Sequence, residues 1–72
     1  MTAAGLEKLK TDLILVKEKL KEIAVRIKDA KDMGDLSENA EYHEAKNEQA
    51  FLYGKAVELE EKIKSAVIAA AH

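Results

Sequence analysis

The chain has 72 residues, of which 47% are hydrophobic and 36% are charged, with a formal net charge of −2 and neither proline nor cysteine. This length holds one small module, and the lack of cysteine excludes a disulfide framework and a thiolate zinc site. No apolar run reaches the roughly 18 residues of a membrane span, and the N-terminus lacks the order of a signal peptide, so the sequence predicts a cytoplasmic protein without membrane contact.

Charge is distributed unevenly along the chain. Residues 7–31 carry eight basic and five acidic side chains, whereas residues 32–48 carry six acidic side chains and one basic side chain. An acidic centre therefore separates a basic arm from a balanced one. This distribution does not predict nonspecific binding of duplex nucleic acid through a large basic face.

Two segments show the alternating three- and four-residue apolar spacing of coiled-coil helices. The first seam consists of Leu6, Leu9, Leu13, Val16, Leu20, Ile23, Ile27 and Ala30. The second seam, with one polar position, consists of Tyr42, Ala45, Gln49, Leu52, Ala56, Leu59, Ile63, Ala66 and Ala70. The pattern predicts an all-α fold: a long antiparallel two-helix coiled-coil hairpin, with helices at about 4–33 and 39–70 and a tip at 34–38.

The register of the hairpin follows from the residue numbers, because facing seam positions should add up to a constant. This holds from Leu6 opposite Ala66 to Ala30 opposite Tyr42, and it puts Leu36 at the apex. Arms of about 30 residues are roughly 45 Å long at a rise of about 1.5 Å per residue. A rod two helices thick has no enclosed pocket. The sequence also contains no nucleophile–base constellation, phosphate-cradling glycine loop or histidine pair, so it does not predict a self-sufficient enzyme.

Self-association is one expectation for so small a module, because two helices bury little surface for their length. The isolated hairpin could form a homodimer, for example as a four-helix bundle. Six apolar residues outside the seams are either scattered surface residues or contacts for another domain or subunit: Ile14, Leu15, Val25, Phe51, Val57 and Ile68.

The connection between the helices contains residues that favour turns and caps. Gly34 suits a left-handed C-terminal cap of the first helix, and Asp35 or Ser37 can cap the second. Asp35 and Glu38 also fit a capping-box-like start of that helix. In the competing interpretation the two carboxylates bind a hard divalent cation. A Mg²⁺ ion held by only two carboxylates would keep bound waters and need further ligands from another molecule.

The histidines and the tyrosine near the tip offer weaker signals. His43 has neither a cysteine nor a helical histidine partner, and His72 is the last residue, so neither predicts a zinc site. Tyr42 fits the seam below the tip, although its phenol could also stack on a nucleotide base.

Ten contiguous residues, Gly34–His43, together with Thr2, Gly5, Lys8 and Leu9, resemble the N-terminal coiled-coil domain of the bacterial transcript cleavage factors of the Gre family. The resemblance covers essentially the whole chain. It implies a hairpin that enters the secondary channel of RNA polymerase and stimulates the polymerase's own hydrolysis of backtracked RNA, which releases arrested complexes. The chain would then be an accessory factor of transcription elongation, associated with the nucleoid through the polymerase, and no enzyme itself. We expect the family's C-terminal polymerase-docking domain to be absent from this chain.

The resemblance also implies roles for single residues. Asp35 and Glu38 resemble the family's catalytic acidic pair, which helps to hold a Mg²⁺ ion shared with the polymerase and orients the attacking water. Such an ion would not bind stably to the isolated chain. Lys31, Lys46 and Tyr42 resemble positions that contact the nascent RNA 3′ end, although the family often has arginine where this chain has the two lysines.

Two other functions stay open. A structural or interaction hairpin would bind polymerase or self-associate without stimulating cleavage, and an altered tip on the same rod would favour it. An RNA-binding arm would have a basic tip, whereas this tip is acidic. The presence of both Asp35 and Glu38 favours the cleavage factor.

Overall fold

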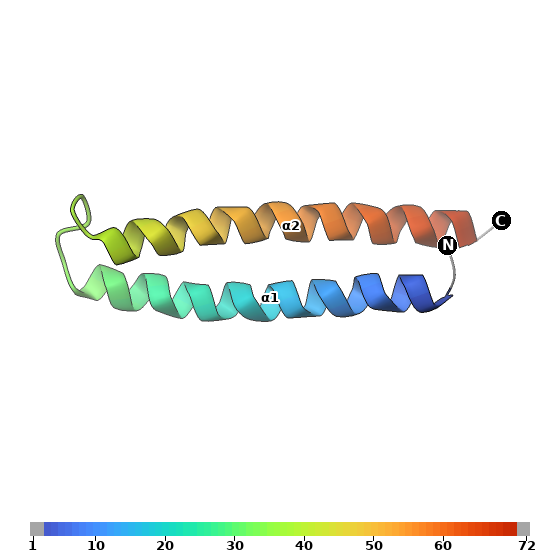
Figure 1. The fold of residues 1–72 in the computed structure, drawn as a ribbon, viewed down its shortest axis with the longest axis horizontal. Coiled ribbons are helices and arrows are strands. Elements are labelled where there is room, and N and C mark those ends of the chain that lie inside the picture. The colour runs from blue at the N-terminus through green and yellow to red at the C-terminus, as the bar shows by residue number, and fades with distance from the viewer. Residues whose placement is uncertain (1–2, 71–72) are drawn as a thin grey trace.

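The computed structural model describes residues 3–70, which form two long helices joined by a turn (Figure 1). Helix α1 is Ala3–Asp32 and helix α2 is Ala40–Ala70. The helices lie side by side and run antiparallel, so that the start of α1 and the end of α2 lie together, opposite the turn. The Cα atoms extend over 54 × 15 × 12 Å. The all-α hairpin predicted from the heptads is confirmed.

The two helices, which we call the shaft, share one apolar seam as their core. The buried residues of its central cluster are Val16, Ile23, Leu52, Ala56 and Leu59, and the half-buried Leu9, Leu13, Leu20 and Ile27 pack against them. Every residue of the two predicted seams whose burial the structure describes is buried or half-buried. Since apolar residues at heptad spacing fall on one face of a helix, the sequence pattern alone accounts for this core.

Two ion pairs join the helices and agree with the antiparallel register. Arg26 Nη1 lies 2.9 Å from Glu48 Oε2, and Lys17 Nζ lies 3.8 Å from Glu60 Oε1. Arg26 directly precedes a seam residue, whereas Lys17 directly follows one, so the two pairs lie on opposite flanks of the seam. Both pairs therefore match the register of the seam, one on each side of the core.

The seam narrows towards the turn. Ala30 and Ala45 occupy it there and are 3% and 1% exposed, in place of the leucine and isoleucine side chains further along the shaft. Short side chains bury less apolar area per residue, so the core contributes less to stability at this end.

The apolar residues outside the seams lie in solvent. The six identified from the sequence are each 51–69% exposed, and they are distributed over both helices. Across the described part of the chain, neither helix is long and apolar enough to cross a membrane.

Candidate functional site

The first helix ends through a glycine in a left-handed conformation. Gly34 has a φ of +85°, and its N–H donates to the carbonyl oxygen of Lys31 at 3.0 Å. The N–H of Met33 donates to the carbonyl oxygen of Ala30 at 3.1 Å, which tightens the last turn of α1. A residue without Cβ adopts this backbone conformation at little cost, so the C-terminal cap predicted at Gly34 is confirmed.

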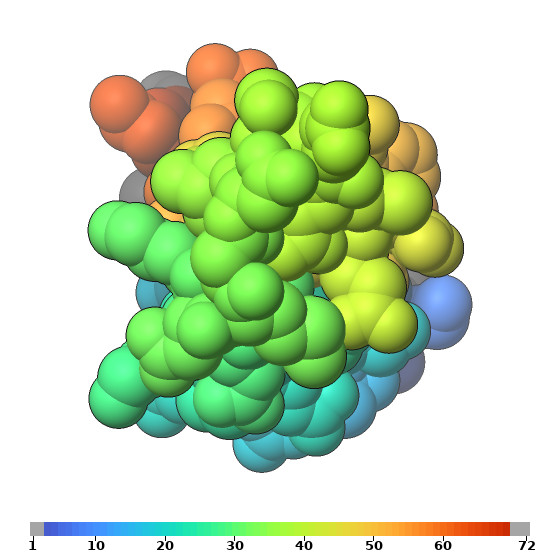
Figure 2. Space-filling model, turned by 90° about the vertical axis from the view of Figure 1, so that its left-hand side faces the viewer, coloured from blue at the N-terminus to red at the C-terminus, as the bar shows by residue number. Residues whose placement is uncertain are grey.

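Residues 33–39, which we call the tip loop, lie at the end of the shaft (Figure 1), the end that faces the viewer in Figure 2. Asp35 follows Gly34 with a φ of +46°, a left-handed conformation that non-glycine residues seldom adopt. Its carbonyl oxygen accepts from the N–H of Glu38 at 3.2 Å, and that of Leu36 accepts from the N–H of Asn39 at 3.4 Å. Two overlapping turns therefore build the loop, with Leu36 in its middle.

The second helix is capped by Asn39, and the sequence-based prediction of this cap was wrong. Asn39 directly precedes Ala40, the first residue of α2, and its Oδ1 accepts from the N–H of Tyr42 at 3.0 Å. Asp35 and Ser37 lie too early in the chain to reach the free N–H groups of the first turn. A capping box formed by Asp35 and Glu38 is likewise not present, because the helix begins only after both residues.

This correction leaves the two acidic side chains of the tip loop free of a capping role. Asp35 and Glu38 are both exposed, and within residues 3–70 neither takes part in an ion pair. The hydroxyl of Ser37 donates to Asp35 Oδ1 over a long 3.4 Å. Both carboxylates thus present oxygen atoms to solvent at the far end of the rod.

The donor set of the tip fits part of a magnesium site. Among the described residues no group of three or more histidine, cysteine, aspartate or glutamate side chains could hold a metal ion. Mg²⁺ commonly takes one or two protein carboxylates and fills the rest of its octahedron with water and substrate oxygens. Asp35 and Glu38 could supply such a partial set, and the remaining ligands would come from a partner. His43 is exposed and belongs to no such group.

The two lysines predicted to contact RNA lie on one flank of the shaft next to the tip loop. Lys31 and Lys46 stand two heptads closer to the turn than Lys17 and Glu60, which pair across this flank at 3.8 Å. The register therefore brings Lys31 and Lys46 to facing positions, one from each helix. Both are exposed, and no ion pair of the described residues includes either of them.

Tyr42 lies at the base of the tip loop. It is half-buried in the seam, as the heptad pattern predicted, and its ring meets that of His43 edge-on with centroids 5.6 Å apart. An aromatic ring in this place supports the start of α2 and leaves part of its surface accessible.

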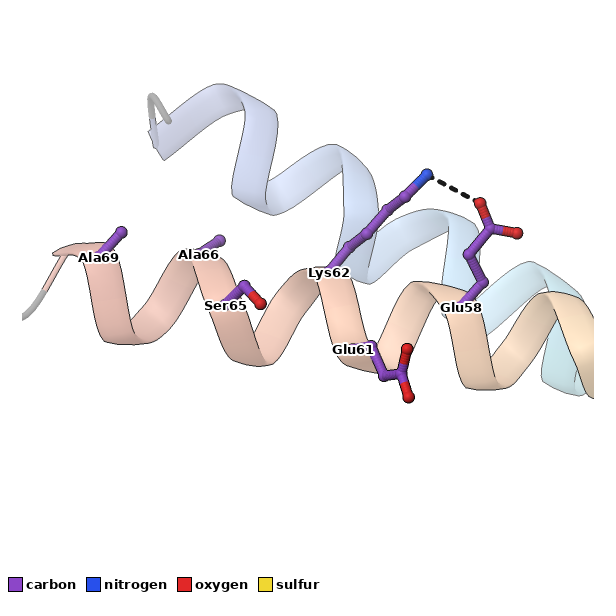
Figure 3. A pocket seen from close by; sticks show the side chains of 6 residues that line it. All are labelled: Glu58, Glu61, Lys62, Ser65, Ala66 and Ala69. Carbon is purple, nitrogen blue, oxygen red and sulfur yellow. Dashed lines mark ion pairs between the residues drawn. The ribbon is translucent and has the colours of Figure 1, made fainter.

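A shallow hollow lies on α2 in the half of the shaft away from the tip loop (Figure 3). It is lined by Glu58, Glu61, Lys62, Ser65, Ala66 and Ala69. Glu58 and Lys62 pair at 3.0 Å, and the hydrogen bond and charge of Lys62 lower the pKa of Glu58. The lining comes from one helix, contains neither histidine nor cysteine, and holds no group of three or more metal-ligating side chains.

The sequence reasoning missed Asn39. Its side chain joins both helices: Nδ2 donates to the carbonyl oxygen of Ala30 at 2.6 Å, while Oδ1 caps α2. Asparagine is among the best N-cap residues, and Asn39 stands directly before the periodic run of α2. That signal could have identified the cap, although not the second hydrogen bond.

Comparison with known proteins identifies one family over nearly the whole chain. A family model described as "Transcription elongation factor, N-terminal", covering GreA and GreB, matches residues 1–68. Transcription elongation factor GreA of Thermosipho melanesiensis is 52% identical over 69 residues, which are 94% of this chain and 44% of that protein. GreA of Clostridium botulinum is 54% identical over 94% of this chain and 43% of its own length, and GreA of Clostridium perfringens is 52% identical over 94% and 44%.

The chain therefore spans less than half the length of the curated relatives that it matches. No solved structure matches it.

Proposed function

Because the chain belongs to the family of GreA and GreB N-terminal domains, we propose that it acts in transcription elongation by stimulating RNA cleavage inside RNA polymerase. The hairpin would enter the secondary channel of a bacterial polymerase and bring its tip loop to a backtracked RNA 3′ end. The observation that carries the proposal is the placement of Asp35 and Glu38. Both carboxylates lie free of capping and ion pairs at the end of a rod 54 Å long.

The proposed chemistry needs the two carboxylates together with groups of the polymerase. A Mg²⁺ ion shared between Asp35, Glu38 and the polymerase would stabilise the charge that develops on the phosphoryl oxygens during hydrolysis. Asp35 and Glu38 would hold part of the ion's coordination shell and would accept hydrogen bonds from the attacking water. The seam leaves no room for an enclosed substrate site in the described part of the chain, so we propose an accessory factor and not an enzyme.

Lys31, Lys46 and Tyr42 fit a contact with the RNA 3′ segment. The two lysines occupy facing positions on one flank beside the tip loop, and no ion pair among residues 3–70 includes either of them. Lysine binds phosphate as a point charge, and a base can stack on the accessible part of a tyrosine ring face. Changing both lysines to glutamine should weaken cleavage and reduce its dependence on salt, without a change in helicity.

The proposal is tested on halted, backtracked complexes of a bacterial RNA polymerase with end-labelled RNA. We expect the chain to shorten the RNA at high concentration. We also expect greater potency when the chain replaces the matching residues of the Thermosipho melanesiensis relative, because tethering to a docking domain raises the local concentration of the tip. The site of action would be the bacterial cytoplasm.

Isosteric amides separate chemistry from folding. Asp35→Asn and Glu38→Gln should nearly abolish stimulated cleavage while helicity and polymerase binding stay unchanged, with partial rescue by excess Mg²⁺ or Mn²⁺. Glu44→Gln is the matched control, because Glu44 is an exposed carboxylate on α2 outside the tip loop. Cleavage at the parent level by both tip variants would refute the catalytic assignment. Binding to polymerase without cleavage by the parent chain would instead establish an interaction hairpin.

A further inference from the structure

The side chain of Asn39 is bonded to three separate pieces of backbone. Its Nδ2 donates to the carbonyl oxygen of Ala30 in α1 at 2.6 Å and, over a longer 3.4 Å, to that of Gly34. Its Oδ1 accepts from the N–H of Tyr42 in the first turn of α2 at 3.0 Å. One amide group thus joins the end of the first helix, the start of the tip loop and the start of the second helix.

Only a side chain that both donates and accepts can make this set of bonds. The carbonyl oxygens of Ala30 and Gly34 require a donor, whereas the N–H of Tyr42 requires an acceptor. Aspartate keeps the N-cap acceptor but, when ionised, has no hydrogen to donate to the two carbonyls. The half-buried position of Asn39 makes a lost partner costly, since water reaches these groups poorly.

The bonds of Asn39 close the loop that carries the two acidic side chains. Gly34 and Asn39 bracket Asp35 and Glu38, so the contact from Asn39 to Gly34 joins the two ends of this stretch. Within it, Asp35 holds a left-handed backbone conformation with a φ of +46°. Such a conformation persists in a non-glycine residue when surrounding interactions fix it. Residues 35–38 are all exposed, and none of them belongs to the apolar core, so hydrogen bonds are the main interactions that can fix it here.

We propose that Asn39 is a positioning residue, which fixes the backbone of the tip loop so that Asp35 and Glu38 are presented together. Its importance for cleavage rests on the function proposed above. Its importance for the conformation of the tip loop does not, so the two can be tested separately.

The test compares Asn39→Asp with Asn47→Asp in the 72-residue chain. Both variants add one negative charge on the tip-proximal part of the molecule, and Asn47 is exposed on α2. Asn39→Asp retains the acceptor that caps α2, so helicity measured by circular dichroism should equal that of the control. By NMR, we expect the strong intraresidue HN–Hα cross peak of a left-handed Asp35 to weaken, and amide exchange at Glu38 to accelerate, in Asn39→Asp alone.

The cleavage assay then gives the functional result. Asn39→Asp should lower stimulated cleavage by about tenfold or more, the size of effect found for groups that orient metal ligands. It should also raise the Mg²⁺ concentration needed for half-maximal cleavage, while polymerase binding stays at the level of Asn47→Asp. A purely structural role of Asn39 would leave the Mg²⁺ requirement unchanged.

The outcomes distinguish the two proposals. An unchanged left-handed Asp35 and unchanged exchange at Glu38 in Asn39→Asp would overturn the positioning role, whatever the polymerase assay shows. A changed tip loop with cleavage and Mg²⁺ dependence at the parent level would overturn its link to catalysis. In a third outcome, Asn39→Asp changes the tip loop as expected but the parent chain never stimulates cleavage. That result would refute the proposed function and retain Asn39 as the residue that fixes the loop.

Discussion

In the shaft, Ile23 and Leu52 are 3% and 7% exposed, whereas residues 33–38 of the tip loop are all exposed. The shaft is stabilised by apolar burial along a continuous seam, and the tip loop by a small set of hydrogen bonds that end on Gly34, Asp35 and Asn39. Hydrogen bonds are directional and burial is not. The comparison indicates that the shaft supplies length and stability, while the conformation of the tip loop depends on a few groups.

The largest effect on stability should come from the centre of the shaft. Ile23→Ala removes a side chain that is 3% exposed, and such truncations cost about 2–5 kcal/mol. Val25→Ala is the control on the same helix, because Val25 is 59% exposed. Thermal unfolding followed by circular dichroism should show a much lower midpoint for Ile23→Ala than for the parent chain. The midpoint of Val25→Ala should be almost unchanged. Equal midpoints would mean that the seam is not the source of stability.

Substitution by alanine should change the free energy of unfolding in opposite directions at Gly34 and Gly54. Gly34 has a φ of +85° and open space around it. Gly34→Ala should therefore destabilise the chain only by the cost of a left-handed backbone in a residue with a Cβ, about 1–2 kcal/mol. Gly54 lies inside α2, also in open space, so Gly54→Ala should stabilise the helix by about 0.5–1 kcal/mol. Urea unfolding of both variants measures the difference. A stabilising Gly34→Ala would contradict the left-handed cap.

A smaller effect is expected from the ion pair nearest the tip loop. Glu48→Gln removes the partner of Arg26, and exposed pairs of this kind contribute about 0.2–1 kcal/mol. The loss should shrink as salt is added, because screening weakens the parent pair as well. Unfolding of the parent and Glu48→Gln in low and high salt measures this loss of stability. Glu60→Gln is the comparison, because the Lys17–Glu60 distance of 3.8 Å predicts a weaker contribution. Salt-independent differences would point to a role other than charge pairing.

The smallest effect is expected from the pair beside the shallow hollow. Lys62 lowers the pKa of Glu58 in the folded chain, first through a hydrogen bond and then through its charge. The stabilisation is therefore present above the unfolded pKa of Glu58 and is lost as the pH falls through its lower, folded pKa. NMR titration of the Glu58 carboxyl carbon should show its pKa rise in Lys62→Gln. An unchanged titration would show that the pair does not persist in solution, and in either case the effect on unfolding should be slight because both groups are exposed.

The sequence by itself determined the shaft. Heptad spacing places the seam residues on one face of each helix, and the constant sum of facing positions gives the register, so burial could be assigned to single residues. It also determined the end of α1, because Gly34 is the residue type that tolerates the left-handed cap. The ten-residue motif at the turn indicated the family that the comparisons show.

Only the tertiary structure decided how the tip loop is built. Local patterns offered Asp35, Ser37 and Glu38 as capping groups, and all can cap a helix that begins close behind them. The structure begins α2 at Ala40 and assigns the cap to Asn39, whose second bond reaches Ala30 in the other helix. That bond exists because the seam brings the ends of the two helices together, a proximity that no local pattern contains. The two carboxylates are left free of capping for the same reason.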